Sequence, residues 1–346
     1  MNKLGWGVIG AGGIADRRTI PEGIIPATNA RLVGVMSSGR ERGDAVAAKY
    51  GVRAYGTVAE LLADSEIGAV YIATPNHLHH DQCLAAAAAG KHVLCEKPLA
   101  LTSAEAEAMA NACRKAGVLL GAGFMMRFNP YHQRIREMIA NGELGTIVFC
   151  RAQLTCWYPP MDHAWRQDPS LGGGGAIMDL TVHCLDLLEM LLGPIGEVSG
   201  YVERRVHDYP SDDTNALLLK FRSGAFGFVD CAFNIPDEAS ENVLEVQGTL
   251  GCIKARMTVG QGPGGIVQVC ALPNMGNYEA AQARNSASYQ PLELEPVNTY
   301  RSQIEAFSRS VLEGTEFPAG AEAGVRSMKL VETIRRAASS KTMETV

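Results

Sequence analysis

The sequence predicts two unlike domains: an α/β domain with a doubly wound parallel sheet, followed by an α+β domain with an open, mostly antiparallel sheet. Three observations predict this. Short apolar runs alternate with helical segments in the first third of the chain, longer strand-like runs follow one another later, and 346 residues exceed what a single core usually holds. We place the boundary after residue 124, which gives domains of residues 1–124 and 125–346.

The apolar runs of the first domain are short and regularly spaced. They are Trp6–Ile9, Arg31–Met36, Ala69–Ala73, His92–Cys95 and Val118–Ala122. Between them, Leu84–Ala89 and Ser103–Lys115 are rich in Ala, Leu, Glu and Met, which lose little on entering a helix. Gly90 and Gly117 follow these segments, where helix C-caps belong. This alternation indicates a parallel sheet covered by helices.

The second domain opens with a helical stretch, Tyr131–Asn141, and then changes to extended patterns. Its strand-like runs are Ile147–Leu154, Glu197–Val206, Ala216–Phe221, Ala225–Phe233, Val243–Gln247 and Ile266–Ala271. Arg222–Gly224 is a hairpin turn pattern, and Gly260–Gly265 is typical of a loop. The closing helices, Thr299–Leu312 and Ala323–Ala338, are candidates to pack back on the first domain.

Composition excludes several classes of protein. With 47% hydrophobic and 20% charged residues the chain is globular, and a net charge of −6 offers no basic surface for nucleic acid or anionic membranes. No run of 18 or more apolar residues occurs, so we expect no membrane span. Nine cysteines without a C-x-x-C pair predict reduced thiols in a cytoplasmic protein.

A glycine-rich turn predicts a dinucleotide site. Gly10-Ala11-Gly12-Gly13-Ile14-Ala15 fits the G-x-G-x-x-G/A pattern directly after an apolar run and before a helical segment, the context of a Rossmann domain. Gly10, Gly12, Gly13 and Ile14 are therefore candidate cofactor residues, because glycines let the backbone approach a pyrophosphate whose charge the helix N-terminus stabilises.

The end of the second apolar run favours NADP(H), with NAD(H) still possible. NAD-binding proteins usually place an acidic residue there, whereas this chain has Ser37, Ser38, Arg40 and Arg42. Hydroxyls and guanidinium groups suit a ribose 2′-phosphate. The alternative interpretation is that the two arginines are ordinary solvated charges at the start of a helix.

Two further strand ends carry polar residues next to a proline. Thr74-Pro75-Asn76 leads to His79, and Glu96-Lys97-Pro98 follows Cys95. Carboxyl ends of parallel strands are where ligands of such sheets bind, and Pro98 restricts Lys97 to an extended backbone. The histidines at 77, 79 and 80 have no carboxylate or thiol at ligand spacing, so we predict no metal.

Asp179 and His183 lie four residues apart after the glycine-rich segment Leu171–Ala176. On a helix they would share one face, where the histidine titrates near neutrality and the aspartate holds or polarises it. In isolation such a pair is also typical of a surface or capping contact.

Together these motifs resemble the glucose-fructose oxidoreductase and inositol dehydrogenase (Gfo/Idh/MocA) family. The resemblance rests on the glycine turn, Thr74-Pro75-Asn76-x-x-His79, Glu96-Lys97-Pro98 and the glycine-led Asp179-x-x-x-His183, and it covers nearly the whole chain. Trp165-Arg166 and the serine and arginine strand end look like the NADPH-dependent 1,5-anhydrofructose reductases. Gly123-Phe124-Met125-Met126 departs from that branch, which tends to carry polar residues there, so the substrate stays open.

The resemblance implies a pocket between the domains for a sugar, polyol or related carbonyl compound. It implies Lys97, Asp179 and His183 as catalytic residues. It also implies that further residues line the cofactor side of the pocket, namely Asn76, His79, Glu96, Arg127 and Arg166. Phe124, Tyr158 and Trp165 are candidate substrate-pocket residues, although aromatic residues near a strand end are as often packing.

The resulting functional prediction is NADP(H)-dependent hydride transfer, with His183 favoured as the proton carrier and Lys97 as the charged residue that orients the substrate. Two alternatives remain: a redox-assisted glycosidase with tightly held NAD, and a cofactor-sensing regulator without chemistry. The open sheet also predicts a homodimer or homotetramer.

Overall fold

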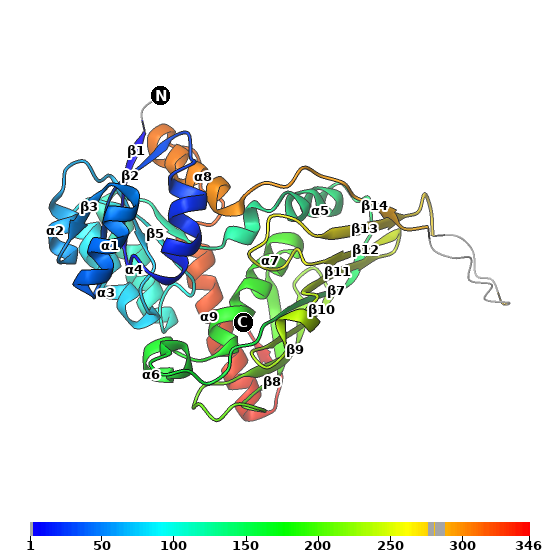
Figure 1. Ribbon diagram of the computed structural model, residues 1–346. Coiled ribbons are helices and arrows are strands. Elements are labelled where there is room, and N and C mark those ends of the chain that lie inside the picture. The colour runs from blue at the N-terminus through cyan, green and yellow to red at the C-terminus, as the bar shows by residue number, and fades with distance from the viewer. Residues whose placement is uncertain (1–2, 276–279, 281–287) are drawn as a thin grey trace.

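The computed structural model describes residues 3–275, 280 and 288–346. It has two sheets in separate layers: sheet A with its helices, and the long strands of sheet B beside it, with the C-terminal helix α9 (Ala321–Ser340) running between them (Figure 1). No helix within the described residues combines the length and apolar character needed to cross a bilayer.

Sheet A is parallel throughout, and its strand order is β3-β2-β1-β4-β5-β6. The strands are β1 (Leu4–Ile9), β2 (Ala30–Met36), β3 (Arg53–Tyr55), β4 (Ala69–Ile72), β5 (His92–Cys95) and β6 (Leu120–Ala122). Every residue of β1 and β4 is buried, as expected for strands covered on both faces. The order reverses between β1 and β4, so the crevice at the carboxyl ends of these two strands is where this fold binds ligands.

The helical elements of the first domain follow the strands in alternation. They are η1 (Ala15–Ile24, a π-helix), α1 (Arg40–Tyr50), α2 (Val58–Ala63), η2 (Asn76–Leu78), α3 (His79–Ala88) and α4 (Ser103–Ala116). Thr102 caps α4 by accepting the N–H of Glu105, and Gly117, with φ +68°, ends it. The parallel sheet and its helices are confirmed, whereas β3 was not predicted, because its three residues form no apolar run.

Sheet B has the order β14-β13-β12-β11-β7-β10-β9-β8-β15, and every pair is antiparallel except β10 with β7. Its strands are β7 (Ile147–Thr155), β8 (Ile195–Glu203), β9 (Thr214–Phe221), β10 (Phe226–Ala232), β11 (Val243–Gly248), β12 (Gly251–Arg256), β13 (Ile266–Ala271), β14 (Gln290–Pro291) and β15 (Glu344–Thr345). The open, mostly antiparallel sheet is confirmed. β12 was missed because it starts with glycine and alternates buried residues with Lys254 and Arg256.

The remaining elements cover sheet B or connect it to sheet A. They are η3 (Met125–Phe128), α5 (Pro130–Ala140), η4 (Trp165–Gln167), α6 (Pro169–Gly172), η5 (Ile177–Thr181, a π-helix), α7 (Val182–Leu192), η6 (Asp237–Ala239) and α8 (Thr299–Glu313). Buried residues occur around the whole circumference of the first turns of α7, so this helix lies in the interior of the domain.

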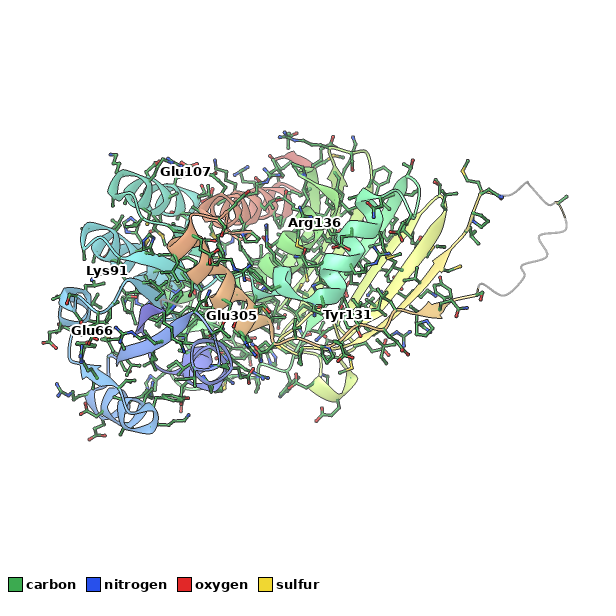
Figure 2. The ribbon with its side chains drawn as sticks, turned by 90° about the horizontal axis from the view of Figure 1, so that it is seen from above. Glu66, Lys91, Glu107, Tyr131, Arg136 and Glu305 are labelled. Carbon is green, nitrogen blue, oxygen red and sulfur yellow. The ribbon has the colours of Figure 1, made fainter. Side chains whose placement is uncertain are left out.

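The last two helices pack against the first domain. Trp6 of β1 donates its indole N–H to Ser308 Oγ of α8 over 3.1 Å, and its ring lies 5.2 Å from that of Phe307. Ahead of α9, Ala122 N donates to Ala319 O over 2.8 Å at the edge of sheet A. Figure 2 shows α8, which carries Glu305, beside the first domain, and α5, which carries Tyr131 and Arg136, beside sheet B.

Candidate active site

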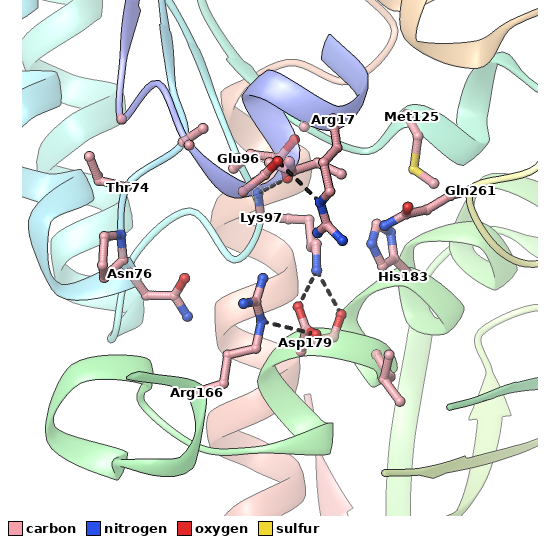
Figure 3. Close-up of a pocket in the computed structure, with 18 of the residues that line it drawn as sticks. Arg17, Thr74, Asn76, Glu96, Lys97, Met125, Arg166, Asp179, His183 and Gln261 are labelled. Carbon is pink, nitrogen blue, oxygen red and sulfur yellow. Dashed lines mark hydrogen bonds and ion pairs between the residues drawn. The ribbon is translucent and has the colours of Figure 1, made fainter. Parts of the chain in front are cut away.

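A cavity of about 710 Å³, a size within the usual range for small-molecule sites, opens at the carboxyl edge of sheet A. The ends of β1, β2, β4 and β5 form one side of it, and segments of the second domain form the other. Predicted residues from both domains line this cavity: Gly10, Gly12, Gly13, Ile14, Ser37, Ser38, Arg42, Thr74, Asn76, His79, Glu96, Lys97, Trp165, Arg166, Asp179 and His183. Figure 3 shows several of them converging on Lys97.

The glycine turn has the geometry that a dinucleotide requires. Gly10 has φ +89°, and a Cβ there would lie 2.8 Å from the Ala73 backbone, so only glycine fits between β1 and β4. The turn leads directly into η1, so the N-terminus of this helix, where the helix dipole favours an anion, lies at the turn. At Gly12 an added Cβ would meet the Arg42 side chain at 3.4 Å, which places this arginine against the turn.

The end of β2 is open to solvent. Ser37 is buried, and Ser38 and Arg42 are exposed; all three line the cavity. Arg40 does not line it, because its Nε pairs with Asp44 at 3.2 Å on the outer face of α1. The structure therefore separates the two arginines that the sequence placed together.

After the end of β4, the side-chain amide of Asn76 uses its N–H donor in a hydrogen bond but leaves its oxygen without one. Asn76 is 3% exposed and donates from Nδ2 to Gly172 O over 2.8 Å, while its buried Oδ1 has no hydrogen-bond partner. An unpaired buried acceptor is costly unless a ligand supplies the donor. His79 is fully buried, with its ring nitrogens 3.0 Å from Pro98 O and 2.9 Å from Thr74 O, so it holds the β4 and β5 ends together.

The end of β5 carries a buried carboxyl group. Burial raises the pKa of Glu96, which the Lys97 charge opposes, and the hydroxyl of fully buried Tyr71 donates to Glu96. Thr19 of η1 in turn donates to the Tyr71 hydroxyl over 2.9 Å. The peptide between Lys97 and Pro98 is cis.

Lys97, Asp179 and Arg166 form one ion-paired cluster. Lys97 Nζ donates to Asp179 Oδ1 over 2.6 Å and to its carbonyl over 2.8 Å, and Arg166 Nε lies 3.1 Å from Asp179 Oδ2 (Figure 3). Burial alone would raise the pKa of Asp179, but the Arg166 and Lys97 charges outweigh it and hold that pKa well below the ordinary range. Asp179 is therefore a carboxylate held by two cations.

The structure corrects the expected pairing of Asp179 with His183. The segment is not one regular α-helix: Asp179 lies in η5 and His183 in α7. Asp179 contacts the two cations, and the buried His183 Nδ1 has no hydrogen-bond partner. Burial, followed by the Lys97 charge, lowers the pKa of His183 well below its usual value, so its imidazole is neutral.

Three other predicted residues do not line the cavity. Phe124 is 1% exposed and packs its ring edge-on against His183, with centroids 6.1 Å apart. Tyr158 packs on Phe233 with ring centroids 4.9 Å apart. Arg127 instead binds Asp186 through Nε and Nη2 and donates to Pro318 O, so it joins η3 to α7 and to the segment before α9.

Several lining residues were not predicted. Arg17 points into the cavity from η1 (Figure 3), and its Nε donates to Gly13 O over 3.2 Å. The second domain contributes polar side chains and methionines: Met125, Met126, Thr155, Asp237, Ser240, Asn242, Met257 and Gln261. Arg17 follows the glycine turn closely enough to have been named. The other residues come from four separate segments, around residues 125–126, 155, 237–242 and 257–261, that only the folded domain brings together.

Comparison with protein families gives two matches along this chain. Residues 4–124 match the oxidoreductase family with an NAD-binding Rossmann fold, and residues 132–254 match the GFO/IDH/MocA C-terminal domain.

Similar individual proteins include 1,5-anhydro-D-fructose reductase from Ensifer adhaerens, 35% identical over 98% of this chain and 97% of that protein. D-xylose 1-dehydrogenase (NADP(+)) 2 from Haloferax volcanii is 31% identical over 97% of both. Among solved structures, aldose-aldose oxidoreductase from Caulobacter crescentus, complexed with glycerol, has a TM-score of 0.88 and 26% identity over all of both chains. A levoglucosan dehydrogenase complex with NADH has a TM-score of 0.87 at 23% identity, covering 100% of this chain and 99% of that one, and shows the same fold.

Proposed function

Because this chain belongs to the GFO/IDH/MocA oxidoreductase family, we propose that it transfers hydride between a nicotinamide cofactor, preferably NADP(H), and a carbonyl or carbinol carbon of a sugar or polyol. One observation carries the proposal: the glycine turn and the Lys97, Asp179 and His183 side chains line a single cavity. A regulator without chemistry has no use for such a cluster. The names of the two similar proteins, a sugar reductase and a sugar dehydrogenase, support the same class of reaction.

The cofactor would lie from the glycine turn to the β5 end. Gly12 and Gly13 leave room for the pyrophosphate at the start of η1, and the unpaired Asn76 Oδ1 can accept a hydrogen bond from the ribose or carboxamide. When bound there, the nicotinamide supplies or accepts the hydride.

Lys97 is the better candidate for the proton carrier in the reductive direction. An ammonium group has three N–H donors, and Asp179 accepts two of them, so the third is free for a substrate oxygen. His183 is neutral at its buried position and can bind and orient the same oxygen without carrying net charge. This assignment reverses the roles that we favoured from the sequence.

The preference for NADP(H) is supported by the open end of β2. Arg42 lies against the glycine turn, no carboxylate among the described residues forms an ion pair with it, and Ser37 and Ser38 line the cavity wall with it. A guanidinium and two hydroxyls are suitable donors for a 2′-phosphate. Arg40, which pairs with Asp44, does not contribute to the proposed phosphate site.

The substrate side of the cavity has hydroxyl-binding and apolar parts. Thr155 Oγ1 donates to Ser240 Oγ over 2.9 Å, and Asn242 and Gln261 line the wall with them. Met125, Met126 and Met257 add apolar surface. A neutral compound with several hydroxyls and a less polar ring face would match both parts.

The test is a turnover assay that follows absorbance of the reduced nicotinamide. NADPH and NADH are each supplied with ketoses, aldoses, osones, anhydrofructose and inososes, and the corresponding polyols are tested with the oxidised cofactors. We expect one substrate class to turn over with a clear preference for NADPH. If no compound in the panel turns over, while the purified protein retains NAD and cleaves chromogenic glycosides, the protein is a redox-assisted glycosidase instead. Equal kinetic constants with both cofactors would remove the NADP(H) preference.

We also propose that the chain forms a homodimer or homotetramer. Outward-facing positions of neighbouring strands in sheet B carry exposed apolar side chains, including Tyr201, Leu218 and Phe226. Such a patch is typical of a protein interface. Sedimentation velocity should show a dimer or larger assembly, and a monomer at working concentration would contradict this.

A further inference from the structure

The position of Asp179 depends on a glycine-rich segment that is held by one aspartate. Asp212, two residues before β9, accepts three consecutive backbone N–H groups of this segment. Its Oδ1 accepts from Gly175 and its Oδ2 from Ile177, each over 2.8 Å, and its carbonyl accepts from Ala176 over 3.1 Å. These three residues lead into η5, the π-helix that carries Asp179: Ala176 is its N-cap and Ile177 its first residue. The free N–H groups at the start of η5 are therefore satisfied by one residue from another part of the chain.

The glycines are what allow this contact. An added Cβ at Gly175 would lie 1.8 Å from Asp212 O, and one at Gly174 would lie 2.5 Å from Arg335 Nη2. Arg335, on α9, reaches past Gly174 and donates to Gly173 O. A carboxylate and a guanidinium therefore hold the segment from the side of the second domain.

The first domain holds the same segment from the opposite side. Asn76 Nδ2 donates to Gly172 O over 2.8 Å, and His77 Nδ1 lies 3.2 Å from Leu171 O. The backbone from residue 171 to 177 is thus fixed at both ends. Asp179 follows two residues later, and its carboxylate in turn fixes Lys97 and Arg166.

We propose that Asp212 is a positioning residue for the reaction, acting through Asp179 on Lys97. The expected loss of kcat rests on the proposed function, but the expected shift of Asp179 away from Lys97 does not. Without the Asp212 carboxylate, Gly175 and Ile177 lose their acceptors and the start of η5 shifts, which moves the Asp179 oxygen away from the Lys97 amine. Cofactor binding at the glycine turn does not involve this segment except through Asn76.

The test compares two adjacent aspartates. Asp213 accepts the backbone N–H groups of Arg205, Val206 and His207, over 2.7 to 2.8 Å, and is fully buried, but its contacts lead away from the cavity. Asp212→Asn and Asp213→Asn each turn one of two accepting oxygens into an NH2 donor, and so break the same kind of capping contact at neighbouring positions. Both variants should melt at lower temperature than the wild type.

At a temperature where both variants are folded, Asp212→Asn should lower kcat by at least about tenfold, because a displacement of about 1 Å near reacting groups can cost a hundredfold. NADPH affinity, measured by fluorescence titration, should change less than about twofold, a small effect since twofold is ~0.4 kcal/mol. Asp213→Asn should leave kcat within about twofold. In a Lys97→Met background the Asp212→Asn change should have no further effect on residual turnover, because both act through one pathway. Equal kcat losses in the two Asn variants, or additive losses with Lys97→Met, would overturn the proposal.

Two measurements keep the inference separate from the proposed function. If the wild type turns over no sugar, a crystal structure of Asp212→Asn still tests it: the 2.6 Å contact between Lys97 Nζ and Asp179 Oδ1 should be lost, and its retention would refute the inference. If Asp212→Asn does not fold, Arg335→Met removes only the second support, at Gly173 O. This variant should show a smaller kcat loss with unchanged NADPH affinity, and a wild-type kcat would count against the proposal.

Discussion

The ends of β2 and β5 lie on the same edge of the same sheet, and each carries cations, yet the two sites are built differently. At β2, Arg40 and Arg42 are exposed, and Arg40 makes a solvated pair with Asp44. At β5, the Lys97 side chain is 11% exposed and its carboxylate partner belongs to the second domain. The difference shows that position on the sheet selects where ligands bind, while contact with the second domain decides which of these charges is desolvated.

Desolvation changes how much an ion pair contributes to the free energy of folding. An exposed ion pair is worth about 0–1 kcal/mol, because water and salt screen it. A buried pair gains little net stability, but removing one partner leaves the other uncompensated and is strongly destabilising. Substitutions at the β5 end and in other buried ion pairs should therefore have larger effects than substitutions at the β2 end.

The largest effect is expected for Lys97→Met. Loss of a positioned proton donor should reduce kcat by about 10²- to 10⁴-fold. Lys91→Met is the matched control, because Lys91 precedes β5 at its other end and donates to Asp64 O and Ile67 O, away from the cavity. Steady-state kinetics measure kcat for both variants, and near-normal turnover by Lys97→Met would remove this residue from the mechanism.

The next effect concerns a buried ion pair within the second domain. Arg127→Met leaves Asp186, whose side chain is 4% exposed, without its cation, and should lower the free energy of unfolding by about 3 kcal/mol or more. Arg151→Met breaks the more exposed pair with Asp230 and should cost no more than about 1 kcal/mol. Urea denaturation measures both, and equal losses would contradict the assigned difference in burial.

Burial should also make stability depend on pH. His132 is fully buried, its Nδ1 lies 3.0 Å from Met126 O, and its Nε2 has no partner, so burial lowers its pKa to about 4. The unfolded chain binds this proton near pH 6.5, and the folded protein only near pH 4. Stability should therefore fall as the pH drops from about 6.5 to about 4, by up to about 3 kcal/mol for this residue.

Measurement of the unfolding free energy across this pH range tests the prediction against His132→Asn. The asparagine can still donate to Met126 O but cannot be protonated, so the variant should have a shallower slope between these pH values. An unchanged slope would mean that His132 does not contribute to acid sensitivity.

The smallest effect is expected at the β2 end. Arg42→Ala should raise the KM for NADPH about tenfold, which corresponds to ~1.4 kcal/mol, and leave that for NADH nearly unchanged. Arg40→Ala should change neither constant by more than about twofold, because Arg40 contacts Asp44 on the outer face of α1. Equal losses in the two variants would show that a general positive field, rather than one contact, selects the phosphate.

What could be predicted from the sequence was local. The strand and helix rhythm, the glycine turn and the Glu96-Lys97-Pro98 strand end each depend on neighbouring residues, and the parallel sheet and the family are confirmed. The open antiparallel sheet was predicted as well, since its runs are long. The sequence gives no sign of β3, which has three residues, or of the π-helical geometry of η5.

Pairings between distant residues could not be predicted. Helical spacing suggested Asp179 with His183, whereas Lys97 and Arg166, which are 82 and 13 positions away from Asp179, are its actual partners. The family resemblance implied that Arg127 lines the pocket, but Arg127 instead pairs with Asp186 on α7. Which residues form an ion pair depends on which charged side chains the fold buries next to one another. The spacing of residues along the chain does not show this.

The return of α8 to the first domain has a consequence for how the protein is made. The face of β1 and η1 that carries Trp6 is completed by Phe307 and Ser308, near the other end of the chain. A ribosome that adds about 5–20 residues per second needs on the order of ten seconds or more to travel from residue 124 to α8. During that interval the nascent cofactor domain exposes an apolar surface, and it is at this stage of synthesis that a chaperone would have a surface to bind.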